Sequence, residues 1–174
     1  GDNTWRKIGT PADVSSVISV AAVDKSDKPG KFTSQGYNAL GEVKPDVAAL
    51  GVLASVGSPK GGYYQGYGTS YSTPILAGGV ACLIQAFPEL SPAEIATLLR
   101  QTAKKSTNPD SIVGYGVAQL EAAYTLQNAR NRKAAAPILI SVSETRALIY
   151  LPNKEDWEYQ LKSERQFLRI LKIK

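Results

Sequence analysis

The residues with the clearest potential for chemistry lie in the segment GYGTSYSTPILAGG, residues 66–79. Ser70 comes shortly before Pro74 and a long apolar run, which predicts a helix over residues 75–87 with Pro74 in its first turn. A hydroxyl at a helix start lies beside unpaired backbone N–H groups and the positive end of the helix dipole, so an oxyanion formed there would be stabilised. Ser70 is therefore a candidate nucleophile. The same residue types also form simple helix caps, and on these residues alone that alternative stays open.

The sequence offers this serine no proton acceptor, because the chain contains no histidine. A serine without an adjacent base is a weak nucleophile. The aspartates at 13, 24, 27 and 46 are predicted at turns and strand ends and form no evident substitute, and Asp46, in KPDV, is interpreted as a structural hydrogen-bond acceptor. With one cysteine and no D-x-D-x-D loop, the sequence gives no local support for a zinc or EF-hand site.

Composition restricts the class of protein further. A chain of 174 residues with 43% hydrophobic residues can bury a core, which argues against a disordered or fibrous protein. No apolar run reaches the roughly 20 residues that a membrane span needs. Residues 130–174 hold ten basic and five acidic side chains, whereas residues 1–129 hold ten of each, so the net charge of +5 comes from the tail. Because the tail alternates basic and apolar residues, it is interpreted as a half-exposed strand and no nucleic-acid partner is predicted.

Apolar runs predict the strands and the first helix. Residues 17–23 predict a strand buried on both faces, and residues 47–56 predict a second, interrupted at Gly51. The glycines at 61, 62, 66 and 68 predict a bend before the helix. That helix is apolar all round and is expected to be buried, with the thiol of Cys82 inside it. A neighbouring backbone is expected to pack closely at Gly78 and Gly79.

Two further helices and a separate tail complete the predicted organisation. Ser91 with Glu94 forms a capping box and Pro92 takes the first helical position, while a third helix starts after Gly116 with Val117, Leu120 and Tyr124 on one face. The stretch near residues 130–137 is polar, so we expect one domain over residues 1–133 and a small β appendage over residues 134–174. Four short strands are predicted in the appendage, at residues 138–142, 147–151, 157–161 and 167–173.

The segment Gly68-Thr69-Ser70, with Pro74 and then Ala77-Gly78, resembles the nucleophile segment of the subtilisin-like serine proteases (subtilases, peptidase S8 type). PADVSSVISVAAVD, KPDVAALGV and GYGVAQLEAA resemble further segments of that family, so the resemblance covers about residues 1–128. Leu50 departs from the family's KPDVxAPG pattern, which has proline there. The resemblance implies an α/β, three-layer αβα fold with a mainly parallel sheet, of which this chain would form the C-terminal part, plus the small C-terminal β appendage.

The resemblance also implies roles for individual residues. Ser70 matches the nucleophile, and its backbone N–H would form one arm of the oxyanion hole. Thr69 and Gly68 would shape the turn that presents it. Gly9 matches the rim of the pocket for the side chain that precedes the scissile bond. Tyr71 stands in place of the usual methionine on the leaving-group side, which predicts a preference for small residues there.

The remaining catalytic groups are expected from elsewhere. In this family aspartate and histidine precede the serine, so His, Asp and the oxyanion Asn are expected from an N-terminal segment of the same parent protease, and this chain alone is expected to be inactive. A catalytically dead module that keeps the fold for binding or regulation is the alternative. The resemblance further implies a protein or peptide substrate, secretion, and, in some members, calcium held by backbone carbonyls near residues 11–17. A homo-oligomer through an exposed sheet edge is also expected.

Overall fold

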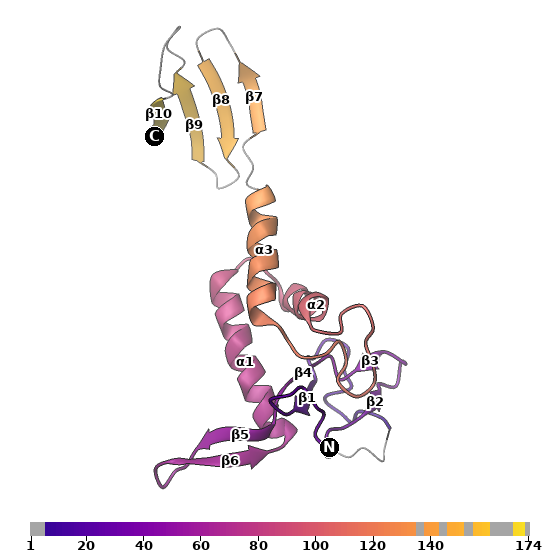
Figure 1. Cartoon of the computed structure of the whole chain (residues 1–174). Coiled ribbons are helices and arrows are strands. Elements are labelled where there is room, and N and C mark those ends of the chain that lie inside the picture. The colour runs from indigo at the N-terminus through magenta and orange to yellow at the C-terminus, as the bar shows by residue number, and fades with distance from the viewer. Residues whose placement is uncertain (1–5, 135–137, 143–145, 152–154, 161–168, 173–174) are drawn as a thin grey trace. The chain divides into compact units, whose positions relative to one another are not determined.

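The structure is a computed structural model that describes residues 6–134, 138–142, 146–151, 155–160 and 169–172 (Figure 1). Its contacts divide the chain into two units, Gly1–Tyr124 and Thr125–Lys174. The dividing point falls inside helix α3, Leu120–Ala134. The expected domain boundary between residues 133 and 134 stays a prediction.

A pair of parallel strands forms the centre of the first unit. Strand β1 (Val20–Val23) pairs in parallel with β4 (Val47–Leu50), with Val20 opposite Val47. On one face, Ala21 and Val23 pack with Val113. The other face, which carries Ala22, lies against helix α1 (Thr69–Ala86). Gly51 shows this contact: a Cβ added to it would lie 2.7 Å from the Cβ of Ala22 and 2.9 Å from Ser72 Oγ of the helix. The prediction of an α/β fold with a parallel sheet is confirmed. The predicted buried strands are confirmed for Val20–Val23 and Val47–Leu50, whereas residues 52–56 belong to a separate and largely exposed strand.

The outer edges of this pair are partly covered. Ala48 donates its N–H to Gly116 O and accepts from the N–H of Ala118. On the other strand, Ala22 O accepts from Gly30 N and Ala22 N donates to Thr33 Oγ1. These bonds reduce the free edge that could pair with a second chain. The homo-oligomer stays a prediction.

Helix α1 begins earlier than the sequence pattern predicts. Its N-cap is Gly68, so Thr69 and Ser70 are its first residues and Pro74 lies inside the helix rather than in its first turn. The prediction for Pro74 was therefore wrong. The helix can start early because Gly68 takes a φ of 152°, which strongly favours glycine, and donates its N–H to Gly51 O at 2.8 Å.

Helix α1 is also less buried than its composition predicts. Its buried residues are Ser72, Leu76 and Leu83, whereas Ile75 and Ile84 are 48% and 50% exposed. The thiol of Cys82 is exposed as well, so the prediction of a buried structural thiol was wrong. The physical reason is that, among the described residues, α1 packs mainly against β1 and β4, which leaves much of its apolar surface uncovered. Apolar composition shows what a helix can bury, but the neighbours decide how much it does.

The two glycines inside α1 differ in their surroundings. A Cβ on Gly79 would collide with the side chain of Leu120, so the close neighbour there is a side chain and not the backbone that was expected. A Cβ on Gly78 would meet nothing within 4 Å. Close packing thus accounts for Gly79 and not for Gly78.

The glycine-rich segment before α1 forms a hairpin rather than the predicted bend. Strand β5 (Val52–Gly57) pairs antiparallel with β6 (Tyr63–Tyr67), and Gly61 and Gly62 lie in the connecting turn with positive φ. Figure 1 shows this hairpin at the N-terminal end of α1. A second, short antiparallel pair joins β2 (Gly36–Tyr37) to β3 (Val43–Lys44).

The second helix confirms its predicted start. Helix α2 (Pro92–Thr102) has Ser91 as N-cap; Ser91 Oγ accepts from Glu94 N at 3.3 Å, and Glu94 Oε2 accepts from Ser91 N at 2.8 Å. Helix α3 starts at Leu120, three residues beyond Val117, which instead forms a bridge to Ala48.

The second unit contains a four-stranded antiparallel sheet with the strand order β10-β9-β8-β7. The four predicted strands are all present, with ends shifted by a few residues: β7 (Ile138–Val142), β8 (Arg146–Leu151), β9 (Glu155–Gln160) and β10 (Arg169–Lys172). Four residues of the predicted strands, 161, 167, 168 and 173, lie outside the described residues. In the part of the chain that the structure describes, no helix is both long and apolar enough to cross a bilayer.

Candidate active site

Ser70 is the second residue of α1 and is exposed. Gly68 offers no side chain as a cap, and the backbone N–H of Ser70 has no acceptor among the described residues. An exposed hydroxyl and a free N–H therefore lie together at the positive end of the helix dipole. This is the arrangement that would favour negative charge on an oxygen bound there.

The turn that presents Ser70 is fixed from the end of strand β4. Gly51 follows β4, donates its N–H to Val23 O at 2.9 Å and accepts from Gly68 N at 2.8 Å. Tyr71 N donates back to Gly68 O at 3.0 Å. A Cβ on Gly51 would lie 2.7 Å from Gly68 O, so only glycine allows this close approach. The sheet thus holds the start of the helix through backbone contacts.

One cavity of about 410 Å³ brings together residues that are far apart in the sequence. Gly9 and Thr69 both line it, so the structure joins the expected pocket rim with the expected nucleophile turn. The side chain of Ser70 and that of Tyr71 are not part of its wall. The complete wall consists of Ile8, Gly9, Thr10, Pro11, Ala12, Val17, Ile18, Ser19, Val20, Ser34, Pro45, Thr69 and Thr73.

Tyr71 lies on the other side of the turn, against the hairpin. A Cβ on Gly66 of β6 would be 2.7 Å from the Tyr71 ring, so the ring packs closely on this glycine. A hydrogen bond with Tyr71, together with burial, raises the pKa of Tyr64 above its ordinary value. The Tyr71 ring is therefore held in place beside Ser70.

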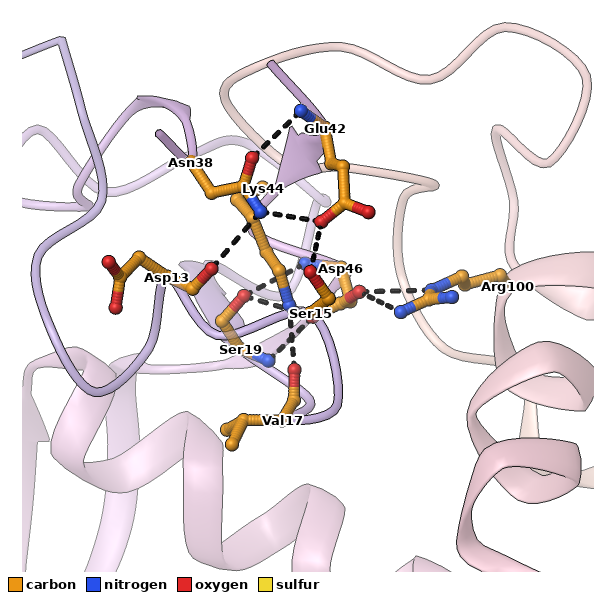
Figure 2. A network of polar contacts seen from close by, with 9 residues as sticks. All are labelled: Asp13, Ser15, Val17, Ser19, Asn38, Glu42, Lys44, Asp46 and Arg100. Atoms are coloured by element: carbon orange, nitrogen blue, oxygen red, sulfur yellow. Dashed lines mark hydrogen bonds and ion pairs between the residues drawn. The ribbon is translucent and has the colours of Figure 1, made fainter. Parts of the chain in front are cut away.

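Behind the cavity, a buried polar network surrounds Asp46 (Figure 2). Asp46 Oδ2 accepts from Ser19 N and from Lys44 Nζ, both at 2.7 Å. Asp46 Oδ1 accepts from Arg100 of α2, at 2.5 Å from Nη2 and 2.9 Å from Nε. The prediction that Asp46 is a structural hydrogen-bond acceptor is confirmed. It is fully engaged and offers no free base to a serine.

A second carboxylate lies at the edge of this network. Glu42 Oε2 accepts from Ser15 Oγ and from Asn38 Nδ2, both at 2.5 Å, and these bonds lower the pKa of Glu42. Sequence reasoning named none of Lys44, Arg100 and Glu42. The only local signal was a lysine placed two residues before Asp46 in KPDV. Among the described residues, no cluster of three or more His, Cys, Asp or Glu could hold a metal ion.

The fold and the site together define a class: an α/β domain with an exposed serine in the first turn of a helix that packs on a parallel sheet. Sequence comparison gives the family. Residues 1–116 match the Peptidase_S8 model, described as the subtilase family, and this chain belongs to that family.

Named relatives and solved structures agree with this assignment. The serine protease AprX of Bacillus subtilis is 32% identical over 136 residues, which cover 66% of this chain and 31% of AprX. The structure of the Clostridium perfringens CspB protease matches with a TM-score of 0.65 and 27% identity, over 70% of this chain and 28% of that one. The self-cleaved protease domain of PatA matches with a TM-score of 0.58 and 26% identity, over 69% of this chain and 44% of that one. The chain thus spans less than half of the length of each.

Proposed function

We propose that the chain carries the nucleophile of a serine endopeptidase. Ser70 Oγ would attack the carbonyl carbon of a peptide bond, the amine would leave with a proton, and water would hydrolyse the resulting acyl-enzyme. The backbone N–H of Ser70 would donate to the oxyanion that forms on the way. The observation that carries this proposal is the exposed serine with an unpaired N–H at the start of α1, in a chain of the subtilase family.

The base would come from polypeptide outside this sequence, because the chain has no histidine. We infer that His, Asp and the oxyanion Asn are supplied by an N-terminal segment of the same parent protease. The exposure of Ser70 supports this, since the hydroxyl is open to a partner side chain. On its own the chain would then be inactive towards peptides. Secretion, the expectation from the family resemblance, belongs to the same proposal.

Substrate would occupy both sides of Ser70. The cavity that Gly9 and Thr69 share supports a pocket for the side chain before the scissile bond. The Tyr71 ring, held on Gly66, supports a narrow space on the leaving-group side. Cleavage of peptide libraries by the parent protease and by its Tyr71→Met variant tests this: the variant should accept larger leaving-group residues, and identical profiles would contradict the role of Tyr71.

The missing histidine also favours the second candidate, a catalytically dead subtilase-fold module for binding or regulation. Labelling by a fluorophosphonate separates the two, because the reagent needs an activated serine. We expect labelling of the parent protein at Ser70, none in Ser70→Ala, and unchanged labelling in Ser16→Ala, another exposed serine. A folded parent that binds peptides but leaves Ser70 unlabelled would support the binding module instead.

A further inference from the structure

Lys44 is the least expected ionisable group in the first unit. Its side chain is 1% exposed, and lysine is almost never fully buried unless it is paired. Its ammonium donates to the backbone carbonyl of Val17 at 2.6 Å and to Asp46 Oδ2 at 2.7 Å. The group is therefore a positive charge bound inside the fold by oxygen atoms, as Figure 2 shows.

The oxygens that bind Lys44 are of the types that bind metal cations. Calcium takes six to eight oxygen ligands from carboxylates, backbone carbonyls and water, at about 2.3–2.6 Å. Here a carbonyl, from Val17, and a carboxylate, from Asp46, converge on one point, and the ammonium of Lys44 stands at that point. Val17 ends the stretch of residues 11–17 in which the family resemblance suggested calcium-binding carbonyls.

The neighbouring carboxylates do not complete a metal site. The Asp13 carboxylate points away from Lys44 in Figure 2, and Glu42 is engaged by Ser15 and Asn38. Asp46 already receives two hydrogen bonds from Arg100, which brings a second positive charge. A divalent ion placed there would have to displace the ammonium and face the guanidinium. Calcium therefore does not fit this position in the wild-type chain.

We propose that the ammonium of Lys44 is a built-in cation that replaces a bound metal ion at this position. It ties Val17 to the carboxylate of Asp46, and Asp46 in turn fixes the N–H of Ser19. Val17 and Ser19 line the cavity shared by Gly9 and Thr69. The wall of that cavity is thus held without metal, whether or not Ser70 is catalytic.

The test removes the ammonium of Lys44 by mutation and measures whether calcium then raises the unfolding midpoint of the variant. Lys44→Ala removes the ammonium, so the carbonyl of Val17, the carboxylate of Asp46 and water can serve as calcium ligands, while the guanidinium of Arg100 keeps the expected affinity weak. In low-sodium buffer, about 10 mM calcium should raise its unfolding midpoint by roughly 3–6 °C over the midpoint in EDTA, for a weak site of about 1 mM affinity. The wild-type midpoint should be the same in both conditions.

Two control variants separate a cation site from a general effect of charge. Lys44→Met fills the space with an uncharged side chain and should show no gain with calcium. Lys25→Ala removes an exposed lysine and should behave as the wild type does. Equal calcium responses in the wild type and in Lys44→Ala, or no response in either, would overturn the proposal.

If Lys44→Ala does not fold in EDTA, folding in calcium supports the proposal. If it folds in neither, the wild-type chain decides. Its midpoint must then be unchanged by calcium, and an amine-reactive reagent must modify Lys25 while leaving Lys44 unmodified under native conditions. A calcium-dependent wild-type midpoint, or ready modification of Lys44, overturns the proposal.

Discussion

Replacement of Asp46 by alanine should be among the most destabilising single changes in the first unit. The Asp46 side chain is 2% exposed and accepts hydrogen bonds from Ser19, Lys44 and Arg100. Without it, the ammonium of Lys44 stays buried and keeps the carbonyl of Val17 as its hydrogen-bond acceptor. The chain must then hold a buried charge without its counter-charge, or unfold locally to hydrate it.

The cost follows from the burial of the pair. Removing one partner of a buried ion pair costs about 3–5 kcal/mol, because the other charge remains desolvated. That is a large share of a typical domain stability of roughly 5–15 kcal/mol. At roughly 2–4 °C per kcal/mol for a chain of this size, the unfolding midpoint should fall by about 6–20 °C.

Unfolding in guanidinium chloride measures this loss. The free energy of unfolding should fall with denaturant concentration at the same slope in both proteins, because a changed slope would indicate a different unfolded or native state. Asp27→Asn is the matched control, because asparagine keeps the left-handed backbone of this position (φ 63°) and removes only the charge. Its partner Lys104 is 50% exposed and Asp27 is 41% exposed, so this change should cost only about 0–1 kcal/mol. The double variant Lys44→Met/Asp46→Leu should recover most of the loss, because it removes both buried charges.

Similar costs for Asp46→Ala and Asp27→Asn would refute this reasoning. So would a double variant that is no more stable than Asp46→Ala, since the loss would then come from packing and not from an unpaired charge.

Three further outcomes follow from local geometry. Gly78→Ala should stabilise α1 by about 0.5–1 kcal/mol, whereas Gly79→Ala should destabilise the chain by about 1–3 kcal/mol because helix α3 blocks the new methyl group; chemical denaturation of both variants measures this. The hydrogen bonds from Ser91 lower the pKa of Glu94, so its pKa in the folded chain lies below its pKa in the unfolded chain. The stabilisation from these bonds is therefore fully present above the unfolded pKa, and it is lost as the pH falls through the folded pKa. The stability difference between wild type and Ser91→Ala should therefore shrink on acidification below about pH 4.5, as thermal unfolding at several pH values would show. The exposed thiol of Cys82 should react with a maleimide in the native chain nearly as fast as in the unfolded chain, and protection would contradict its position.

The features that sequence predicts well are those set by nearby residues. Ser91 and Glu94 lie three positions apart and form the capping box as expected, because both partners are in the same turn. The four strands of the second unit also follow from local alternation of apolar and polar residues.

The features that sequence misses depend on distant neighbours. The burial of α1 depends on how much of it the strands cover, and its own composition carries no such information. Sequence analysis did not predict the hairpin of β5 and β6, because glycines interrupt the alternation of residue types around Tyr63–Tyr67. One of these glycines, Gly66, leaves the space in which the Tyr71 ring packs. Lys44 was missed because its partner Val17 is 27 positions away.

Strand β4 connects the two parts of the candidate site that sequence analysis treated separately. Asp46 precedes the strand and anchors the cavity wall at Ser19, while Gly51 follows it and holds Gly68 at the start of α1. Four residues of regular parallel pairing lie between these two anchors, so the position of Ser70 relative to the cavity is set inside this chain. Under the proposed function, an additional segment would therefore supply the proton acceptor and further oxyanion donors, whereas the placement of the serine is set by this chain.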